Sequence, residues 1–145
     1  TGIAYGISSA YILQALHEND KGTLYSIDNV FKPWESREMI GNAIPKNLQN
    51  RWKLTVGTSS EKLEKIFQSI EKADIFLHDS LHTYKNMLLE FQTAWPFIKN
   101  NGFLLSDDIG DNNAFLEFYL ANEGHPILLK NTKNMETTLG ILRKN

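Results

Sequence analysis

Apolar segments of strand length alternate with segments of helical period along most of this chain. Strands are predicted at residues 23–28, 52–57, 74–79 and 102–107, and helices at 60–70, 84–97 and 113–122. This alternation is typical of an α/β fold with a mainly parallel sheet, and the third and fourth strands read as buried on both faces. An earlier helix is predicted from Ser8 or Ser9, either of which is a suitable cap, to about His17. Its expected buried positions are Tyr11, Ile12, Ala15 and Leu16.

The C-terminal part predicts a different strand pairing. Strand patterns at 125–130 and 137–144 are separated by a few polar residues, too few for a parallel crossover, so the two should pair as an antiparallel hairpin. A doubly wound sheet also needs a strand before the opening loop, whereas Thr1 already stands where that strand should end. We therefore expect one Rossmann-like, doubly wound domain over residues 1–145, with a C-terminal hairpin and a first strand that is cut short. The polar residues 33–50 are expected to hold one helix with loops.

Composition excludes several classes of function. Fifteen Lys and Arg against seventeen Asp and Glu give a net charge of −2, with no basic run that would follow a phosphate backbone, so nucleic acid is not an expected partner. The absence of cysteine excludes disulfides and thiolate metal sites, and fits a reducing compartment. No apolar stretch approaches the roughly 18 residues of a membrane span. We expect a cytoplasmic protein without a membrane partner, and leave a homo-oligomer open.

The opening stretch "TGIAYG" carries small residues at alternate positions, Gly2, Ala4 and Gly6, directly before a helical pattern. Such a loop lets the backbone pass close to a ligand. It is not the dinucleotide fingerprint, because Ser9 stands where the third glycine is required. Asp28, which closes the next predicted strand, is placed to accept hydrogen bonds from ribose hydroxyls. A plain tight turn and a solvated Asp28 are the alternatives.

The densest candidate chemistry is "HDSLHTY" at residues 78–84, followed by "SDDI" at 106–109. Both follow predicted parallel strands, at the edge where open α/β sheets place their ligands. Three carboxylates, those of Asp79, Asp107 and Asp108, should converge there, and charges this close need a cation or protons. An all-oxygen set suits Mg²⁺ better than Zn²⁺. The alternative is that these aspartates cap helices or face water.

These motifs together resemble class I S-adenosylmethionine-dependent methyltransferases of the family-24 type, related to the catechol O-methyltransferase group. The resemblance is carried by "TGIAYGISS", "SIDN", "DIFLHDSLHTY" and "NNGFLLSDDI". It implies a methionine-binding loop at the start, a ribose-binding strand end, and "GTSS" at 57–60 beside the adenine. The cofactor residues that it implies, together with those argued above, are Gly2, Ala4, Tyr5, Gly6, Ser8, Asp28, Asn29, Gly57, Thr58, Ser59 and Asp79. It also puts Asp79, Asp107 and Asp108 at the positions of the Mg²⁺ ligands of metal-dependent relatives.

We accordingly expect methyl transfer from S-adenosylmethionine to a hydroxyl of a small-molecule acceptor, assisted by Mg²⁺. His82 is the expected general base, since an imidazole accepts a proton near neutral pH, although it could instead cap a helix or bind the metal. His78 competes for this role, but strand alternation turns it away from Asp79 and favours packing. Two rival functions are an NAD-dependent oxidoreductase and a binding module that keeps the fold without turnover.

Overall fold

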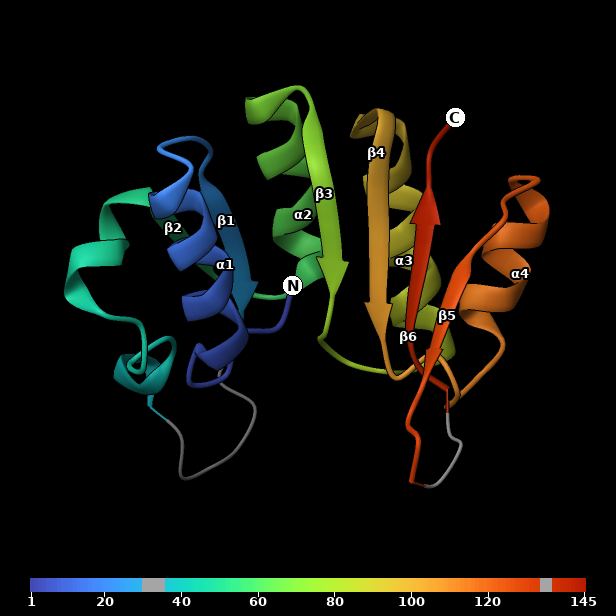
Figure 1. Cartoon of the computed structure of the whole chain (residues 1–145), viewed down its shortest axis with the longest axis horizontal. Coiled ribbons are helices and arrows are strands. Elements are labelled where there is room, and N and C mark those ends of the chain that lie inside the picture. Colours follow the sequence, from blue (N-terminus) through green and yellow to red (C-terminus); the bar gives the residue numbers. More distant parts are fainter. Residues whose placement is uncertain (30–35, 134–136) are drawn as a thin grey trace. The chain divides into compact units, whose positions relative to one another are not determined.

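The computed structural model describes residues 1–29, 36–133 and 137–145, and it divides into two compact units, Thr1–Lys62 and Leu63–Asn145 (Figure 1). The first unit contains one α-helix, two strands and two short 3₁₀ helices. In chain order these are α1 (Ile7–Glu18), β1 (Leu24–Asp28), η1 (Arg37–Met39), η2 (Lys46–Arg51) and β2 (Trp52–Val56). The two strands pair in parallel, with Leu24 opposite Trp52 and Asp28 opposite Val56. Their carboxyl ends therefore lie side by side.

The helix α1 differs from its prediction at both its cap and its buried face. It begins at Ile7, and its N-cap is Gly6 in the left-handed conformation rather than a serine. Tyr11 is 77% exposed, whereas Leu13 is fully buried and forms a core cluster with Ile44 and Leu48. The prediction was wrong for Tyr11 and Ala15, which are exposed, whereas Ile12 is partly buried and Leu16 packs against that cluster. Residues 41–48 cover the helix from a side that periodicity alone does not identify. The predicted helix within 33–50 is replaced by η1 and η2, and residues 33–35 lie outside the described part of the chain.

The second unit contains a four-stranded sheet in the order β3-β4-β6-β5 (Figure 1). Its strands are β3 (Ala73–His78), β4 (Ile98–Asp107), β5 (Ile127–Lys130) and β6 (Thr137–Arg143). The pair β3 and β4 is parallel, and β6 runs antiparallel to both β4 and β5. Consequently β3, β4 and β5 share one direction, and β6 alone opposes them. This confirms the mainly parallel α/β fold and the C-terminal hairpin, while the single domain over the whole chain stays a prediction.

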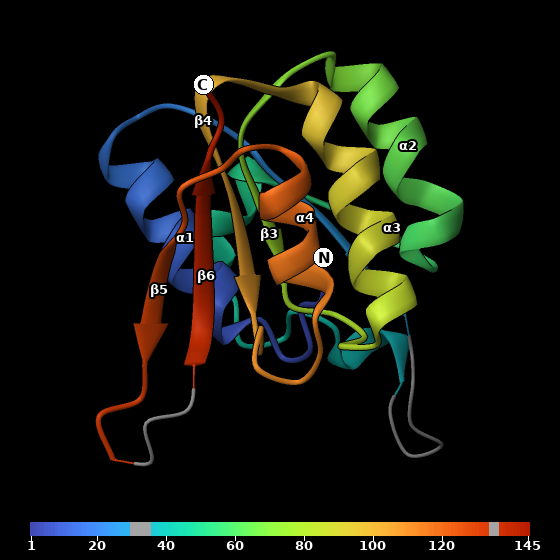
Figure 2. The ribbon, with the colours of Figure 1, turned by 90° about the vertical axis from the view of Figure 1, so that its right-hand side faces the viewer.

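Three helices are associated with this sheet: α2 (Ser59–Ile70), α3 (Tyr84–Ala94) and α4 (Ala114–Ala121). Figure 2 shows α3 and α4 on the same face of the sheet. Aromatic rings form much of the core, since Phe91 lies 6.1 Å from Phe115 and 5.4 Å from Phe118 between ring centroids. The strand β3 is less buried than predicted, because Ile75 is 60% exposed while Phe76 is covered. None of the described helices is long and apolar enough to cross a membrane.

The pairing of β3 with β4 determines where the candidate chemistry lies. His78, the last residue of β3, is in register with Ser106 of β4, and both are fully buried. The next residue of each segment is an aspartate, Asp79 after β3 and Asp107 at the end of β4. Two parallel strands that end in register thus deliver two carboxylates to the same edge of the sheet.

Candidate active site

The opening loop of the first unit is built from left-handed residues at alternate positions. Gly2, Ala4 and Gly6 have φ values of 77°, 47° and 88°, and this region of φ favours glycine. The Gly6 N–H donates to the carbonyl of Ile3 at 2.8 Å, which closes the turn directly before α1. A side chain at Gly6 would lie 2.8 Å from the Cα of Gly41, so the loop is packed tightly against its neighbour. The small residues seen in the sequence therefore serve both the turn and this close approach.

Asp28, at the end of β1, holds the opening loop in place. Its Oδ2 accepts hydrogen bonds from the backbone N–H groups of Ile3 and Ala4, both at 2.7 Å, and its Oδ1 accepts from Asn29 N–H at 2.6 Å. The sequence predicts a ribose-binding or a solvated carboxylate here, whereas the structure shows that Asp28 accepts hydrogen bonds within its own chain. A carboxylate has about four lone-pair positions, so it retains acceptor capacity beside these three hydrogen bonds.

The predicted adenine loop lies beside Asp28. The Gly57 N–H donates to the Asp28 carbonyl at 2.8 Å, and the hydroxyls of Thr58 and Ser60 are 3.0 Å apart. The carbonyl of Thr58 accepts from Glu61 N–H at 3.2 Å and from Lys62 N–H at 3.1 Å, in the first turn of α2. The "GTSS" segment is therefore also the entry to α2.

Most of the predicted cofactor residues are gathered at the carboxyl ends of β1 and β2 and in the loop before α1. Through the hydrogen bonds above, the structure brings together Gly2, Ala4, Gly6, Asp28, Asn29 and Gly57, the Gly2 N–H donating to Ile27 O at 3.0 Å. Thr58 and Ser59 follow directly and are half-buried. Tyr5 and Ser8 are exposed, and Asp79 belongs to the second unit.

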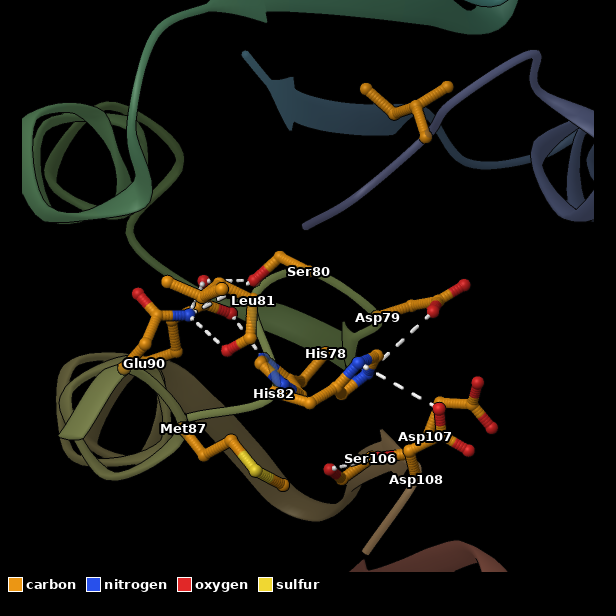
Figure 3. Close-up of polar contacts among 12 residues, drawn as sticks. His78, Asp79, Ser80, Leu81, His82, Met87, Glu90, Ser106, Asp107 and Asp108 are labelled. Atoms are coloured by element: carbon orange, nitrogen blue, oxygen red, sulfur yellow. Dashed lines mark hydrogen bonds and ion pairs between the residues drawn. The ribbon is translucent and has the colours of Figure 1, made fainter. Parts of the chain in front are cut away.

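In the second unit, His82 lies between two groups of carboxylates. Its Nε2 is 3.9 Å from Asp79 Oδ1, and its Nδ1 is 3.8 Å from Asp108 Oδ2 (Figure 3). Asp79, His82 and Asp107 each offer one ligand atom within 4.8 Å of the others, and His82 with Asp108 and Asp111 does the same. The three predicted ligands Asp79, Asp107 and Asp108 do not form one such group among the described residues. The difference arises because Asp108 has a positive φ of 46° and belongs to the next turn.

The charges in this cluster are not balanced within the described part of the second unit. Burial raises the pKa of the Asp79 carboxyl, and the neighbouring charge of Asp107 raises this pKa further, while His82 lowers it. The Nε2 of His82 is buried and has no hydrogen-bond partner among the described residues. A group that bridged the two carboxylates and this nitrogen would satisfy all three.

Sequence reasoning missed the residues that hold the segment between β3 and α3. Glu90 of α3 is fully buried, and its Oε1 accepts from the Ser80 hydroxyl at 2.7 Å. Asn112 donates from Nδ2 to the carbonyl of His82 at 3.1 Å. A signal for Glu90 was present, because it lies on the same helical stripe as Met87, Phe91 and Ala94, where an acid is unexpected.

The fold is that of class I methyltransferases that use S-adenosylmethionine. Residues 1–109 match the model of a family described as a methyltransferase domain. Because this match covers most of the chain, the chain belongs to that methyltransferase family. No curated protein sequence matches the chain well enough to count as a relative.

Solved structures with this fold are similar over nearly the whole chain. An O-methyltransferase from Bacillus cereus in complex with SAH has a TM-score of 0.73 at 14% identity, over 99% of this chain and 71% of that one. The O-methyltransferase NovP has a TM-score of 0.70 at 13% identity, over 100% of this chain and 70% of that one. An rRNA methylase from Streptococcus thermophilus has a TM-score of 0.63 at 15% identity, over 99% and 82%. At these identities the likeness establishes the fold, so the acceptor class and the exclusion of nucleic acid stay predictions.

Proposed function

We propose that this chain binds S-adenosylmethionine and transfers its methyl group to a hydroxyl oxygen of a small-molecule acceptor. The observation that carries the proposal is the cluster of Asp79, His82 and Asp107, which gathers two carboxylates and a ring nitrogen at one edge of the sheet. Membership of the methyltransferase family supports the transfer of a methyl group. Two similar structures are O-methyltransferases, which supports oxygen as the acceptor atom.

The proposed cofactor contacts come from the first unit. Ala4 and Tyr5 of its opening loop are exposed, and among the described residues no side-chain hydrogen bond caps the start of α1. The first-turn N–H groups of a helix attract a carboxylate such as that of the methionine moiety. The remaining acceptor capacity of Asp28 suits a ribose hydroxyl, and the "GTSS" segment suits the adenine.

His82 is the proposed general base. Its buried Nε2 has no hydrogen-bond partner among the described residues, so it is available to an acceptor's proton. In the transfer, the bond between the sulfonium sulfur and the methyl carbon breaks while the bond from acceptor oxygen to that carbon forms. The acceptor's proton passes to a ring nitrogen of His82.

The residues of the cluster fit a divalent cation, because two carboxylates and an imidazole nitrogen come within 4.8 Å of one another. We propose that Asp79 and Asp107 hold Mg²⁺, with Asp108 in reach of His82 from the other side. Such an ion would act as a Lewis acid that orients the acceptor oxygen and lowers its pKa. We choose Mn²⁺ as the probe for binding experiments, in competition with Mg²⁺, because the site offers a ring nitrogen of His82 beside its carboxylates.

Calorimetry with SAH and NAD as alternative ligands tests the cofactor assignment. We expect SAH to bind and NAD not to bind. Binding of NAD alone would favour the oxidoreductase, and binding of SAH without turnover on any hydroxyl acceptor would favour a binding module. An RNA acceptor in the same turnover assay tests the exclusion of nucleic acid, since a similar structure is an rRNA methylase.

Replacing His82 by alanine tests the base once an acceptor is found. We expect turnover to fall by about 10²-fold to 10⁴-fold with SAH affinity unchanged. His125→Ala is the matched control, because this histidine is exposed and belongs to neither cluster. A turnover within about threefold of the parent contradicts the role, and a loss of Mn²⁺ affinity moves His82 to the metal. Full activity in excess EDTA would exclude the Mg²⁺ proposal.

A further inference from the structure

We propose that Glu90 is a positioning residue, which holds residues 78–82 so that Asp79 and His82 stay directed toward Asp107. The proposal rests on the proposed function of this cluster, because it explains what keeps the cluster assembled. Glu90 acts on this cluster through His78, Ser80 and Asn86.

The burial of Glu90 requires an explanation. Its side chain is 0% exposed, on a helix face otherwise formed by Met87, Phe91 and Ala94. A carboxylate in such surroundings is destabilising unless its oxygens accept hydrogen bonds, and a leucine or methionine would pack there without that cost. The acid at this position therefore serves its polar contacts rather than the packing of α3.

Those contacts all lead to the segment that carries the proposed chemistry (Figure 3). Glu90 Oε2 is 2.7 Å from Nδ1 of His78, and Oε1 accepts from Ser80 Oγ at 2.7 Å and from Asn86 Nδ2 at 3.2 Å. The same amide of Asn86 donates to the carbonyl of Leu81 at 3.0 Å. One buried carboxylate thus fixes the residues on both sides of Asp79 and, through Asn86, the residue before His82.

The histidine pair extends this control to the ring of His82. We take Glu90 to be ionised, and an ionised carboxylate only accepts hydrogen bonds. Nδ1 of His78 then carries the proton between them, and Nε2 is the other ring nitrogen. That Nε2 is buried and has no hydrogen-bond partner among the described residues. The ring of His78 stands edge-on to the ring of His82, with centroids 5.3 Å apart and an interplanar angle of 87°. Glu90 therefore fixes the tautomer and plane of His78, and His78 supports the ring of His82.

The substitution Glu90→Gln tests this arrangement with little change in shape. Glutamine offers one acceptor oxygen, so its NH₂ group must face either His78 Nδ1 or the donors of Ser80 and Asn86. We expect Nδ1 of His78 to become the acceptor and Nε2 to carry the proton, a change of tautomer visible in ¹⁵N NMR of the histidines. We also expect the amides of residues 80–82 to exchange faster, and the dissociation constant for Mn²⁺ to rise about 10-fold to 100-fold.

Ser80→Ala removes the hydrogen bond that Ser80 donates to Glu90 and the one that it accepts from Asn86 Nδ2 at 3.2 Å. It leaves His78 paired with Glu90, so the tautomer should stay and Mn²⁺ affinity should fall by a smaller factor. Thr93→Val is the matched control, because Thr93 on the same helix donates its hydroxyl only to the Leu89 carbonyl, at 2.7 Å. This control should leave Mn²⁺ affinity, the tautomer and the exchange of residues 80–82 unchanged.

These experiments distinguish a failure of the proposed metal function from a failure of the positioning role of Glu90. If the parent chain does not bind Mn²⁺, the proposed metal function fails, while the tautomer and the amide exchange still test the role of Glu90. If Glu90→Gln keeps both the parent tautomer and the parent exchange rates, the positioning role is wrong. Equal losses of Mn²⁺ affinity in Thr93→Val and Ser80→Ala would also overturn it, because they would indicate a general effect of packing on α3.

Discussion

The two regions of candidate chemistry differ in the groups that stabilise each of them. In the first unit, the loop before α1 is fixed by backbone groups, with the Asp28 carboxylate accepting from three N–H groups of its own chain. In the second unit, side chains form the site, and they leave the Nε2 atoms of His78 and His82 buried without hydrogen-bond partners among the described residues. The first region is complete in itself, whereas the second has unsatisfied groups that a ligand would satisfy.

This difference predicts which property a substitution in each region should change. Changes in the loop before α1 should alter stability directly, because the Asp28 carboxylate and the loop N–H groups are already paired with one another. Changes in the charged cluster should act mainly through ligands and pH, because repulsion between Asp79 and Asp107 is part of the unliganded protein.

The largest effect is expected for Gly6→Ala. A Cβ there would meet Gly41 Cα and Ile44 Cγ1, both at 2.8 Å, at a φ of 88°. Backbone strain and overpacking together should lower the free energy of unfolding by about 2 to 5 kcal/mol, measured by urea denaturation. Gly22→Ala is the matched control, since its φ is 91° but its Cβ meets only the end of the Leu16 side chain. Equal losses in the two variants would mean that the packed loop contributes nothing beyond backbone strain.

The next effect is expected for Asp28→Ala, which leaves three backbone donors without their acceptor. A hydrogen bond to a charged group contributes about 1.5 to 3 kcal/mol, but water can replace the acceptor for the exposed donors of Ala4 and Asn29. We therefore expect a loss of stability of about 2 to 3 kcal/mol in total, and weaker SAH binding by calorimetry. Asp74→Ala, which removes an exposed ion pair with Lys99, should cost at most about 1 kcal/mol. An Asp28→Ala variant that loses SAH affinity with no loss of stability would contradict the structural role assigned to this carboxylate.

A smaller effect, of the opposite sign, is expected for Asp79→Asn in metal-free buffer. Burial and the charge of Asp107 raise the pKa of the folded carboxyl, so its contribution to stability is present at low pH and is lost as pH rises through that raised pKa. The variant should therefore melt slightly above the parent at pH 7, and the difference should disappear below about pH 3.9, the ordinary pKa of aspartate.

Added Mn²⁺ should reverse the order of Asp79→Asn and the parent at pH 7, because the cation binds the carboxylate of the folded parent. Asp74→Asn serves as the control for the loss of one negative charge, since Asp74 is exposed. A difference in melting temperature that stays constant from pH 3 to pH 7 is incompatible with the raised pKa.

The smallest effect is expected for Ala4→Gly, which relieves a left-handed alanine at a φ of 47°. Relief of strain exceeds the added freedom of the unfolded chain, so we expect a gain of about 0.5 to 1 kcal/mol in unfolding free energy. Ala10→Gly, inside α1, should instead cost about 1 kcal/mol. Equal signs for the two substitutions would show that the strained φ of Ala4 is not a feature of the folded protein.

The fold was largely predictable from sequence because hydrophobic periodicity and connection length reflect local geometry. The parallel strands and the hairpin of β5 and β6 followed from these alone. The buried face of α1 was not predictable, because Leu13 is covered by Ile44 and Leu48, and which segment covers a helix is a tertiary fact. The helix expected within residues 33–50 failed for a related reason, since short 3₁₀ turns leave no clear period.

The part of the candidate site that lies at the strand ends was predictable from sequence. Asp79 and Asp107 could be paired from sequence because their strands are parallel and end in register. Their grouping with His82, in place of Asp108, depends on the path of the loop after β3. Glu90 was overlooked because its role appears only when α3 is packed against that loop, although an acid on an apolar stripe was a visible anomaly.

The position of β6 between β4 and β5 also constrains how the second unit folds. Among the described strands, β5 pairs only with β6, and β4 meets β5 through β6 alone. The pair of β3 and β4 can form without β6, whereas β5 joins the sheet only after residues 137–143 have been synthesised. Pairing of β6 with β4 requires closure of a long loop, so we expect the β6 and β5 side of the sheet to form later and more slowly than the pair of β3 and β4.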